Sequence, residues 1–120
     1  MMTSIRSRVG AAVAIVLFAA GTAQAHPKLL AASPAAGATV AAPARIELHF
    51  NESLEASFSG GKLTSAATVA PMVARVEPTD SKTLILTPPP HLAPGVYKLT
   101  WHVVGTDTHR VEGVYVFTVR

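Results

Sequence analysis

Residues 96–104 read Val-Tyr-Lys-Leu-Thr-Trp-His-Val-Val, and this stretch decides the fold class. Apolar and polar side chains alternate along it, with Tyr97, Leu99 and Trp101 on one side. Successive side chains of a β-strand point to opposite faces, so a period of two residues is typical of a strand with one buried face. The stretch therefore predicts a long strand that packs its apolar face into a core.

The same pattern recurs on both sides of this stretch, in short runs separated by Pro, Gly, Ser and Asp clusters. The expected strands are 28–32, 45–50, 61–65, 72–77, 83–87, 96–104 and 114–119. The expected core side chains are Ile46, Leu48, Phe50, Leu84, Leu86, Tyr97, Leu99, Trp101, Val103, Tyr115, Phe117 and Val119. Seven strands fit an all-β fold, either a sandwich or a small barrel.

The first 25 residues have the three-part plan of a secretory signal peptide. Two arginines precede the apolar run 9–20, and Ala23-Gln24-Ala25 is a small-x-small cleavage site. A membrane anchor is the alternative, but the run of 12 residues is shorter than the roughly 20 that span a bilayer. We expect a signal peptide over residues 1–25 and one exported domain over residues 26–120, with no membrane insertion after cleavage.

Composition excludes several classes of protein. With 49% hydrophobic and 14% charged residues, the chain should fold rather than stay disordered. Removal of Arg6 and Arg8 leaves eight basic and seven acidic residues, so the net charge falls from +3 to +1 and predicts no nucleic-acid partner. Cysteine is absent, so any metal must bind nitrogen, oxygen or thioether ligands.

Cleavage after Ala25 would make His26 the first residue, where an α-amine and an imidazole can chelate one metal. Pro27 has no backbone N–H, so the second peptide nitrogen cannot become a ligand. Asp107 precedes His109 by two residues, and in an extended chain such side chains point the same way. The alternative is a turn aspartate beside a solvated histidine. Together the amine, two imidazoles and a carboxylate suit Cu(II), although nitrogen ligands also suit Zn(II) and Ni(II).

A set of segments along residues 26–120 resembles the CopC family of periplasmic copper-resistance proteins. These segments are 26–29 (His-Pro-Lys-Leu), 33–37 (Ser-Pro-Ala-Ala-Gly), 46–52 (Ile-Glu-Leu-His-Phe-Asn-Glu), 92–97 (Leu-Ala-Pro-Gly-Val-Tyr), Trp101, 107–109 (Asp-Thr-His) and 117–119 (Phe-Thr-Val). The resemblance implies a seven-stranded Greek-key β-barrel or sandwich, related to cupredoxin and immunoglobulin-like folds, with one Cu(II) near the N-terminus.

By position, the resemblance implies His26, Asp107 and His109 as copper ligands, with Glu52 near the site to orient the amine or a copper-bound water. For Glu52, an exposed carboxylate at a strand end is the alternative. Some family members carry a methionine-rich Cu(I) loop, but the corresponding stretch 64–72 has one methionine, Met72. We therefore expect a Cu(II)-only member, with Met72 in or near the core. The remaining histidines, His49, His91 and His102, are expected to face solvent.

The resulting prediction is a periplasmic protein that sequesters or carries Cu(II) without turnover. We expect a monomer, with an inner-membrane copper transporter of the CopD type as the candidate partner. Two alternatives remain open: a copper monooxygenase with an N-terminal histidine chelate, and a secreted immunoglobulin-like module without metal.

Overall fold

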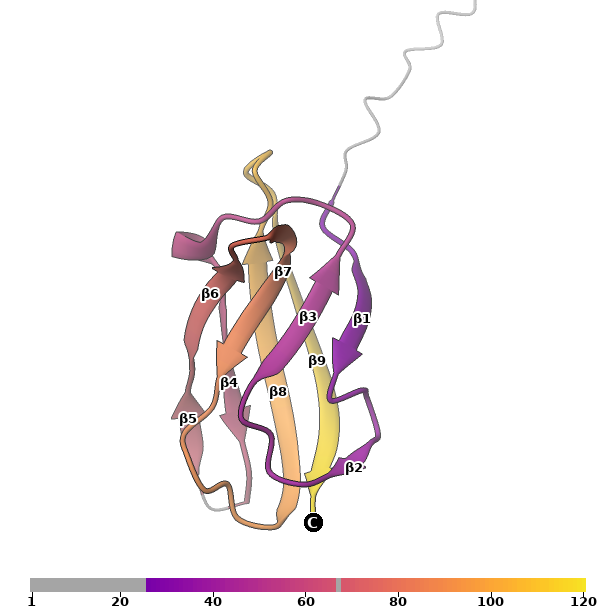
Figure 1. Ribbon diagram of the computed structural model, residues 1–120, viewed down its shortest axis with the longest axis vertical. Helices are drawn as coiled ribbons and strands as arrows, with labels where there is room; N and C mark the ends of the chain where they lie inside the picture. The colour runs from indigo at the N-terminus through magenta and orange to yellow at the C-terminus, as the bar shows by residue number, and fades with distance from the viewer. Residues whose placement is uncertain (1–25, 67) are drawn as a thin grey trace, which may run out of the picture.

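The computed structural model describes residues 26–66 and 68–120, which form two β-sheets packed face to face (Figure 1). The predicted signal peptide lies outside the described residues. One sheet has the order β1 (Leu29–Ser33), β3 (Ile46–Phe50), β7 (Asp80–Thr87), β6 (Val73–Glu77). The other has the order β2 (Thr39–Val40), β9 (Arg110–Val119), β8 (Gly95–Val104), β4 (Gly60–Thr64), β5 (Val69–Pro71). A short 3-10 helix, η1 (Ala56–Phe58), precedes β4.

The all-β prediction is confirmed, and the fold is a two-sheet sandwich rather than a closed barrel. All seven predicted strands form, with ends that differ by up to four residues. The prediction missed two short strands, β2 and β5. Strands of two and three residues are too short for alternation to reveal them. Both lie at sheet edges, and β2 pairs with β9 in parallel through Thr39 and Val40.

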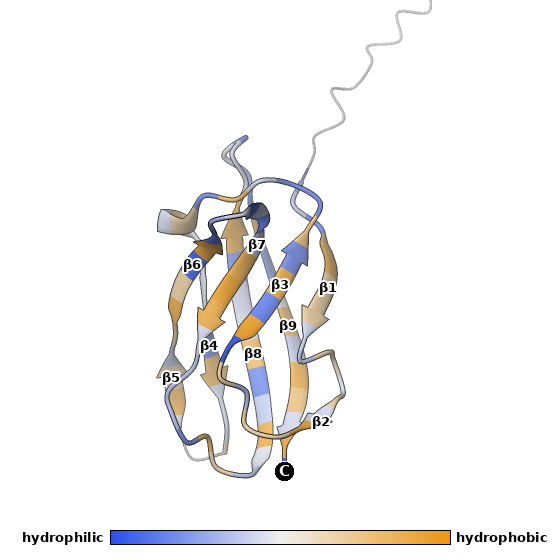
Figure 2. Cartoon of the chain, in the orientation of Figure 1, coloured by the Kyte–Doolittle hydropathy of each residue, from blue (hydrophilic) through white to orange (hydrophobic). Residues whose placement is uncertain are grey.

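The core lies between the sheets and contains nearly all the side chains that alternation assigned to it. Tyr115 differs, because it is half-buried at the margin of the core. Ile85 is a buried residue that alternation left out; it lies between Glu47 on β3 and Arg75 on β6, outside the main core cluster. Met72 packs against the core, as predicted. Figure 2 shows the alternating hydropathy along β3 and β8.

Three segments that are distant in sequence meet at one end of the sandwich. They are the start of the described chain before β1, the segment that follows β3, and the β8–β9 loop, all at the top of Figure 1. The C-terminus lies at the opposite end. This arrangement follows from the antiparallel pairing of β1 with β3 and of β8 with β9. Among the described residues, no helix is long and apolar enough to cross a membrane.

Candidate metal centre

A tight loop joins β8 to β9 and carries Asp107 and His109. The Gly105 N–H donates to the His109 carbonyl at 3.0 Å, and the Thr108 N–H donates to the Gly105 carbonyl at 2.9 Å. Thr108 adopts a left-handed backbone conformation with φ of 73°. The prediction assumed an extended chain here, which is wrong, because the segment is a turn. The convergence of Asp107 with His109 is nevertheless correct, since the turn brings both side chains together.

Both carboxylate oxygens of Asp107 make hydrogen bonds with His109. Asp107 Oδ2 lies 3.0 Å from His109 Nδ1, and Asp107 Oδ1 accepts a 3.2 Å hydrogen bond from the His109 backbone N–H. The side-chain hydrogen bond from His109 is the largest cause that lowers the pKa of Asp107, so the carboxylate is ionised at neutral pH. An ionised carboxylate only accepts, so the hydrogen of this bond is on Nδ1, and in the neutral imidazole Nε2 carries the lone pair.

The structure places His26 against His109. The two imidazole rings meet edge to face, with centroids 4.8 Å apart and planes at 80°. His26 is exposed, whereas the next residue, Pro27, is buried. The Pro27 ring packs on Gly105, where a Cβ atom added to the glycine would lie 3.0 Å from Pro27 Cγ. The N-terminal segment is therefore seated on the loop that holds His109.

Glu52 reaches the same loop from the segment after β3. The Cβ position at Gly105 lies 3.3 Å from Glu52 Oε2 and 2.7 Å from Asp107 Oδ1, so two carboxylates flank this glycine. The Thr106 N–H donates to the Ser53 carbonyl at 3.1 Å, which ties the two segments together. Glu52 is half-buried at this position.

The four predicted site residues thus gather at one end, but they do not form a closed ligand cluster. Within residues 26–66 and 68–120, no three His, Asp or Glu side chains stand close enough together to hold a metal ion. The predicted set includes one donor that is not a side chain, the α-amine of His26. In the full-length chain this nitrogen is bonded to Ala25, so the donor arises only on cleavage.

The other histidines have contacts of their own. His49 points outward from β3, and its Nδ1 shares a 2.9 Å hydrogen bond with Thr83 Oγ1. His102 lies on the outer face of β8, where burial and the Arg110 cation lower its pKa and keep the ring neutral. His91 lies in the proline-rich turn and is exposed.

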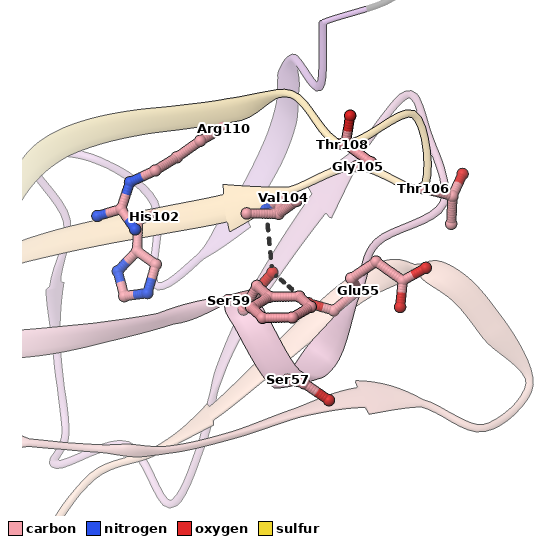
Figure 3. Close-up of a pocket in the computed structure, with 10 residues that line it drawn as sticks. Glu55, Ser57, Ser59, His102, Val104, Gly105, Thr106, Thr108 and Arg110 are labelled. Atoms are coloured by element: carbon pink, nitrogen blue, oxygen red, sulfur yellow. Dashed lines mark hydrogen bonds between the residues drawn. The ribbon is translucent and has the colours of Figure 1, made fainter.

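A surface hollow of about 810 Å³ adjoins the candidate centre (Figure 3). Its lining comes from the η1 region, the outer face of β8 and the β8–β9 loop, and includes Phe58 and His102. Ser59 joins two sides of this hollow, because its hydroxyl donates to the Glu55 carbonyl before η1 and accepts from the Val104 N–H of β8. None of His26, Asp107 and His109 lines this hollow, so the hollow and the candidate centre occupy different places.

Asn51 is a residue of this end that the sequence did not single out. Its side-chain Oδ1 accepts a 2.7 Å hydrogen bond from the Lys28 backbone N–H. A single asparagine after a strand is typical of any turn, so the sequence carried no signal for this contact.

Comparisons with known proteins agree with this architecture. A family model described as the CopC domain matches residues 29–120. Copper resistance protein C of Pseudomonas syringae pv. tomato is 43% identical over 118 residues, covering 88% of this chain and 94% of that protein. The crystal structure of PcoC, a methionine-rich copper resistance protein from Escherichia coli, superposes with a TM-score of 0.68 at 40% identity, covering 80% of this chain and 100% of that one. The crystal structure of CopC from Methylosinus trichosporium OB3b gives a TM-score of 0.72 at 33% identity, covering 78% and 93%. On the extent of the family match and of these similarities, the chain belongs to the CopC family.

Proposed function

We propose that this protein is exported to the periplasm, loses residues 1–25, and there binds one Cu(II) that it sequesters or carries. The observation that supports this most is the contact between the His26 and His109 rings, whose centroids lie 4.8 Å apart, beside the Asp107 carboxylate. Two imidazoles from opposite ends of the mature chain, with an anionic oxygen next to them, are a nitrogen and oxygen donor set of the kind that Cu(II) prefers.

Each residue would supply a distinct donor. His26 would chelate through its free amine and its ring nitrogen, and His109 would bind through Nε2, because its Nδ1 donates to Asp107. Asp107 would offer an oxygen ligand as well as fixing the His109 ring, since a carboxylate has lone pairs for both. Its negative charge and that of Glu52 would offset the charge of Cu(II). Glu52 would act from just outside the ligands, on the amine or on a copper-bound water.

The oxidation state follows from the donors that residues 26–120 offer. The sequence has no cysteine, and Met72 is the one methionine left after the proposed cleavage. Met72 packs against the hydrophobic core. Cu(I) favours several soft sulfur ligands, which one thioether cannot supply. The related PcoC is described as methionine-rich, so this chain would be a Cu(II)-only variant of the family.

Carriage without turnover is favoured over oxidation. Trp101 is only 6% exposed and packs edge to face on Phe50 in the core, so it is not available as a platform for a polymeric substrate. Asp107 would also occupy a copper position that oxygen chemistry needs open. A monomeric carrier of this kind would exchange copper with a membrane transporter of the CopD type.

The decisive experiment is a copper titration of the mature protein, with N-terminal sequencing of the same sample and paramagnetic resonance of the complex. We expect a sample that begins at His26 to bind one Cu(II) with a spectrum of nitrogen and oxygen ligands. A sample that begins at His26 and takes up no Cu(II) at micromolar concentrations would refute the proposal and favour a metal-free interaction module.

A further inference from the structure

The N-terminal segment of the mature protein has few ways to be held in place. The nitrogen of His26 is reserved for copper in the proposed function, and Pro27 has no N–H. The first backbone donor that can anchor this segment is therefore the N–H of Lys28. What binds that N–H decides how firmly the chelating residue is held.

Asn51 binds both backbone groups of Lys28. Its side-chain Oδ1 accepts from the Lys28 N–H at 2.7 Å, and its own N–H donates to the Lys28 carbonyl at 3.1 Å. This pair extends the β1–β3 ladder by one step beyond the pairing of Leu29 with Phe50. The Asn51 side chain takes the part that a backbone carbonyl would play if β3 continued.

The position of Asn51 links this anchor to the candidate centre. Asn51 directly precedes Glu52, whose carboxylate lies beside Gly105, and the buried Pro27 ring packs on the same glycine. Proline fixes its own φ at about −65°. With Lys28 bonded on both sides and Pro27 packed, the remaining freedom of His26 lies almost entirely in its own torsions.

We propose that Asn51 is a positioning residue for copper binding, which holds the N-terminal segment so that the His26 chelate faces His109 before the metal arrives. This inference rests on the proposed function. Preorganisation of this kind raises affinity because the ordering entropy is lost on folding and not on binding. Asn51 itself does not touch the metal; it acts through Lys28 and Pro27.

The test compares Asn51→Ala, Asn51→Asp and Ser53→Ala in protein that begins at His26. Asn51→Asp keeps an accepting oxygen for the Lys28 N–H. Ser53→Ala is the matched control, because it removes a 2.8 Å hydrogen bond to Ser81 in the same segment without touching Lys28. Three readouts apply: exchange of the Lys28 amide hydrogen in metal-free protein, Cu(II) affinity, and the paramagnetic resonance spectrum.

For Asn51→Ala we expect faster Lys28 exchange, an affinity for Cu(II) lower by about fivefold to tenfold, and a broadened spectrum, as one lost hydrogen bond would cause. Asn51→Asp should restore slow exchange and a single sharp spectrum, and Ser53→Ala should match the native protein. Fast Lys28 exchange in Asn51→Ala with native affinity and spectrum would overturn the inference while leaving copper binding intact. Absence of Cu(II) binding in the native protein would instead overturn the proposed function.

Discussion

The imidazole rings of His26 and His109 lie edge to face, with their centroids 4.8 Å apart, although they come from opposite ends of residues 26–120. Pairing of β1 with β3 brings the first ring to this end, and the β8–β9 loop brings the second. The pair therefore exists only in the folded chain. The amine that would complete the chelate exists only in the cleaved one. Copper binding should depend on both events.

An N-terminal extension should abolish tight binding. Retention of residues 1–25, or of one methionine before His26, converts the α-amine of His26 into an amide. The His26 imidazole can then no longer form a chelate ring with that nitrogen. We expect the Cu(II) affinity to fall by roughly 100-fold, or about 2.7 kcal/mol, measured by competition with a chelator. The matched control is an extension at Arg120, at the opposite end of the sandwich. Equal affinities for extended and native termini would show that the amine is not a ligand.

Substitutions at the centre should rank by the donor that each removes. His26→Ala breaks the chelate and His109→Ala removes the second imidazole, so each should weaken Cu(II) binding by about 100-fold or more, beyond the range of outer ligand partners. Asp107→Asn keeps one accepting oxygen but loses the charge and one of the two hydrogen bonds that Asp107 accepts from His109, and should cost less. Glu52→Gln should cost about tenfold, at the low end of the range for residues that orient the ligands from outside.

The remaining histidines supply the controls for this series. The Cu(II) affinity should be unchanged in His49→Ala, His91→Ala and His102→Ala, because these three rings lie on the sandwich away from the candidate centre. All variants should stay folded, since none of these side chains is in the core. Loss of binding in His102→Ala together with native binding in His109→Ala would place the centre in the hollow of Figure 3 instead.

Most of the sandwich could be predicted from alternation, because one face of each long strand is buried and the other is not. Trp101 and His102 on β8 show this clearly, with adjacent residues in the core and on the outer face. Alternation failed where burial has another cause. Ile85 is fully buried although it lies outside the main core cluster, with Glu47 and Arg75 as its partners on the adjacent strands.

The candidate centre was predictable only in part. His26 and the Asp107–His109 pair carry their chemistry in the sequence, as a new terminus and a close spacing. The role of Asn51 could not be predicted, because its partner is a backbone N–H 23 residues away and only the β1–β3 register brings them together. The turn that carries Asp107 was predicted only as the alternative, because it places Thr108 in a left-handed backbone conformation that threonine seldom adopts.

Reduced copper should bind poorly. We expect Cu(I) to be released to a soft chelator under conditions in which Cu(II) stays bound, because Met72 is the sole sulfur in residues 26–120 and packs on the core. Met72→Leu should therefore leave both affinities unchanged. A tight Cu(I) complex that Met72→Leu abolishes would refute the Cu(II)-only assignment.

Acid should release Cu(II). Protons compete with copper for the ligands, and an α-amine ordinarily has a pKa of about 7.7–8.0 and an imidazole of about 6.5. Each of these ligands must lose its proton to bind copper, so the Cu(II) affinity should fall progressively as the pH is lowered below these pKa values. The measurement is a chelator competition at several pH values between about 5 and 8. A pH-independent affinity over this range would exclude amine and imidazole ligands.

Two tyrosines should respond in opposite ways to loss of their hydroxyl groups. Within the described residues, the buried Tyr115 hydroxyl has no hydrogen-bond partner, and burial raises the pKa of Tyr115 to about 12. The native state thus holds this proton more tightly than the unfolded state. The free energy of unfolding is therefore unaffected by this group below pH 10 and falls as the pH rises towards 12.

Tyr115→Phe removes the unsatisfied hydroxyl. It should raise the free energy of unfolding by about 1 kcal/mol and reduce the fall of that free energy at alkaline pH. Tyr97→Phe is the matched control; its hydroxyl donates to the Ala93 carbonyl at 2.7 Å, so its removal should cost about 1 kcal/mol in urea unfolding at neutral pH. Equal destabilisation of the two variants would mean that the Tyr115 hydroxyl is hydrogen-bonded in solution.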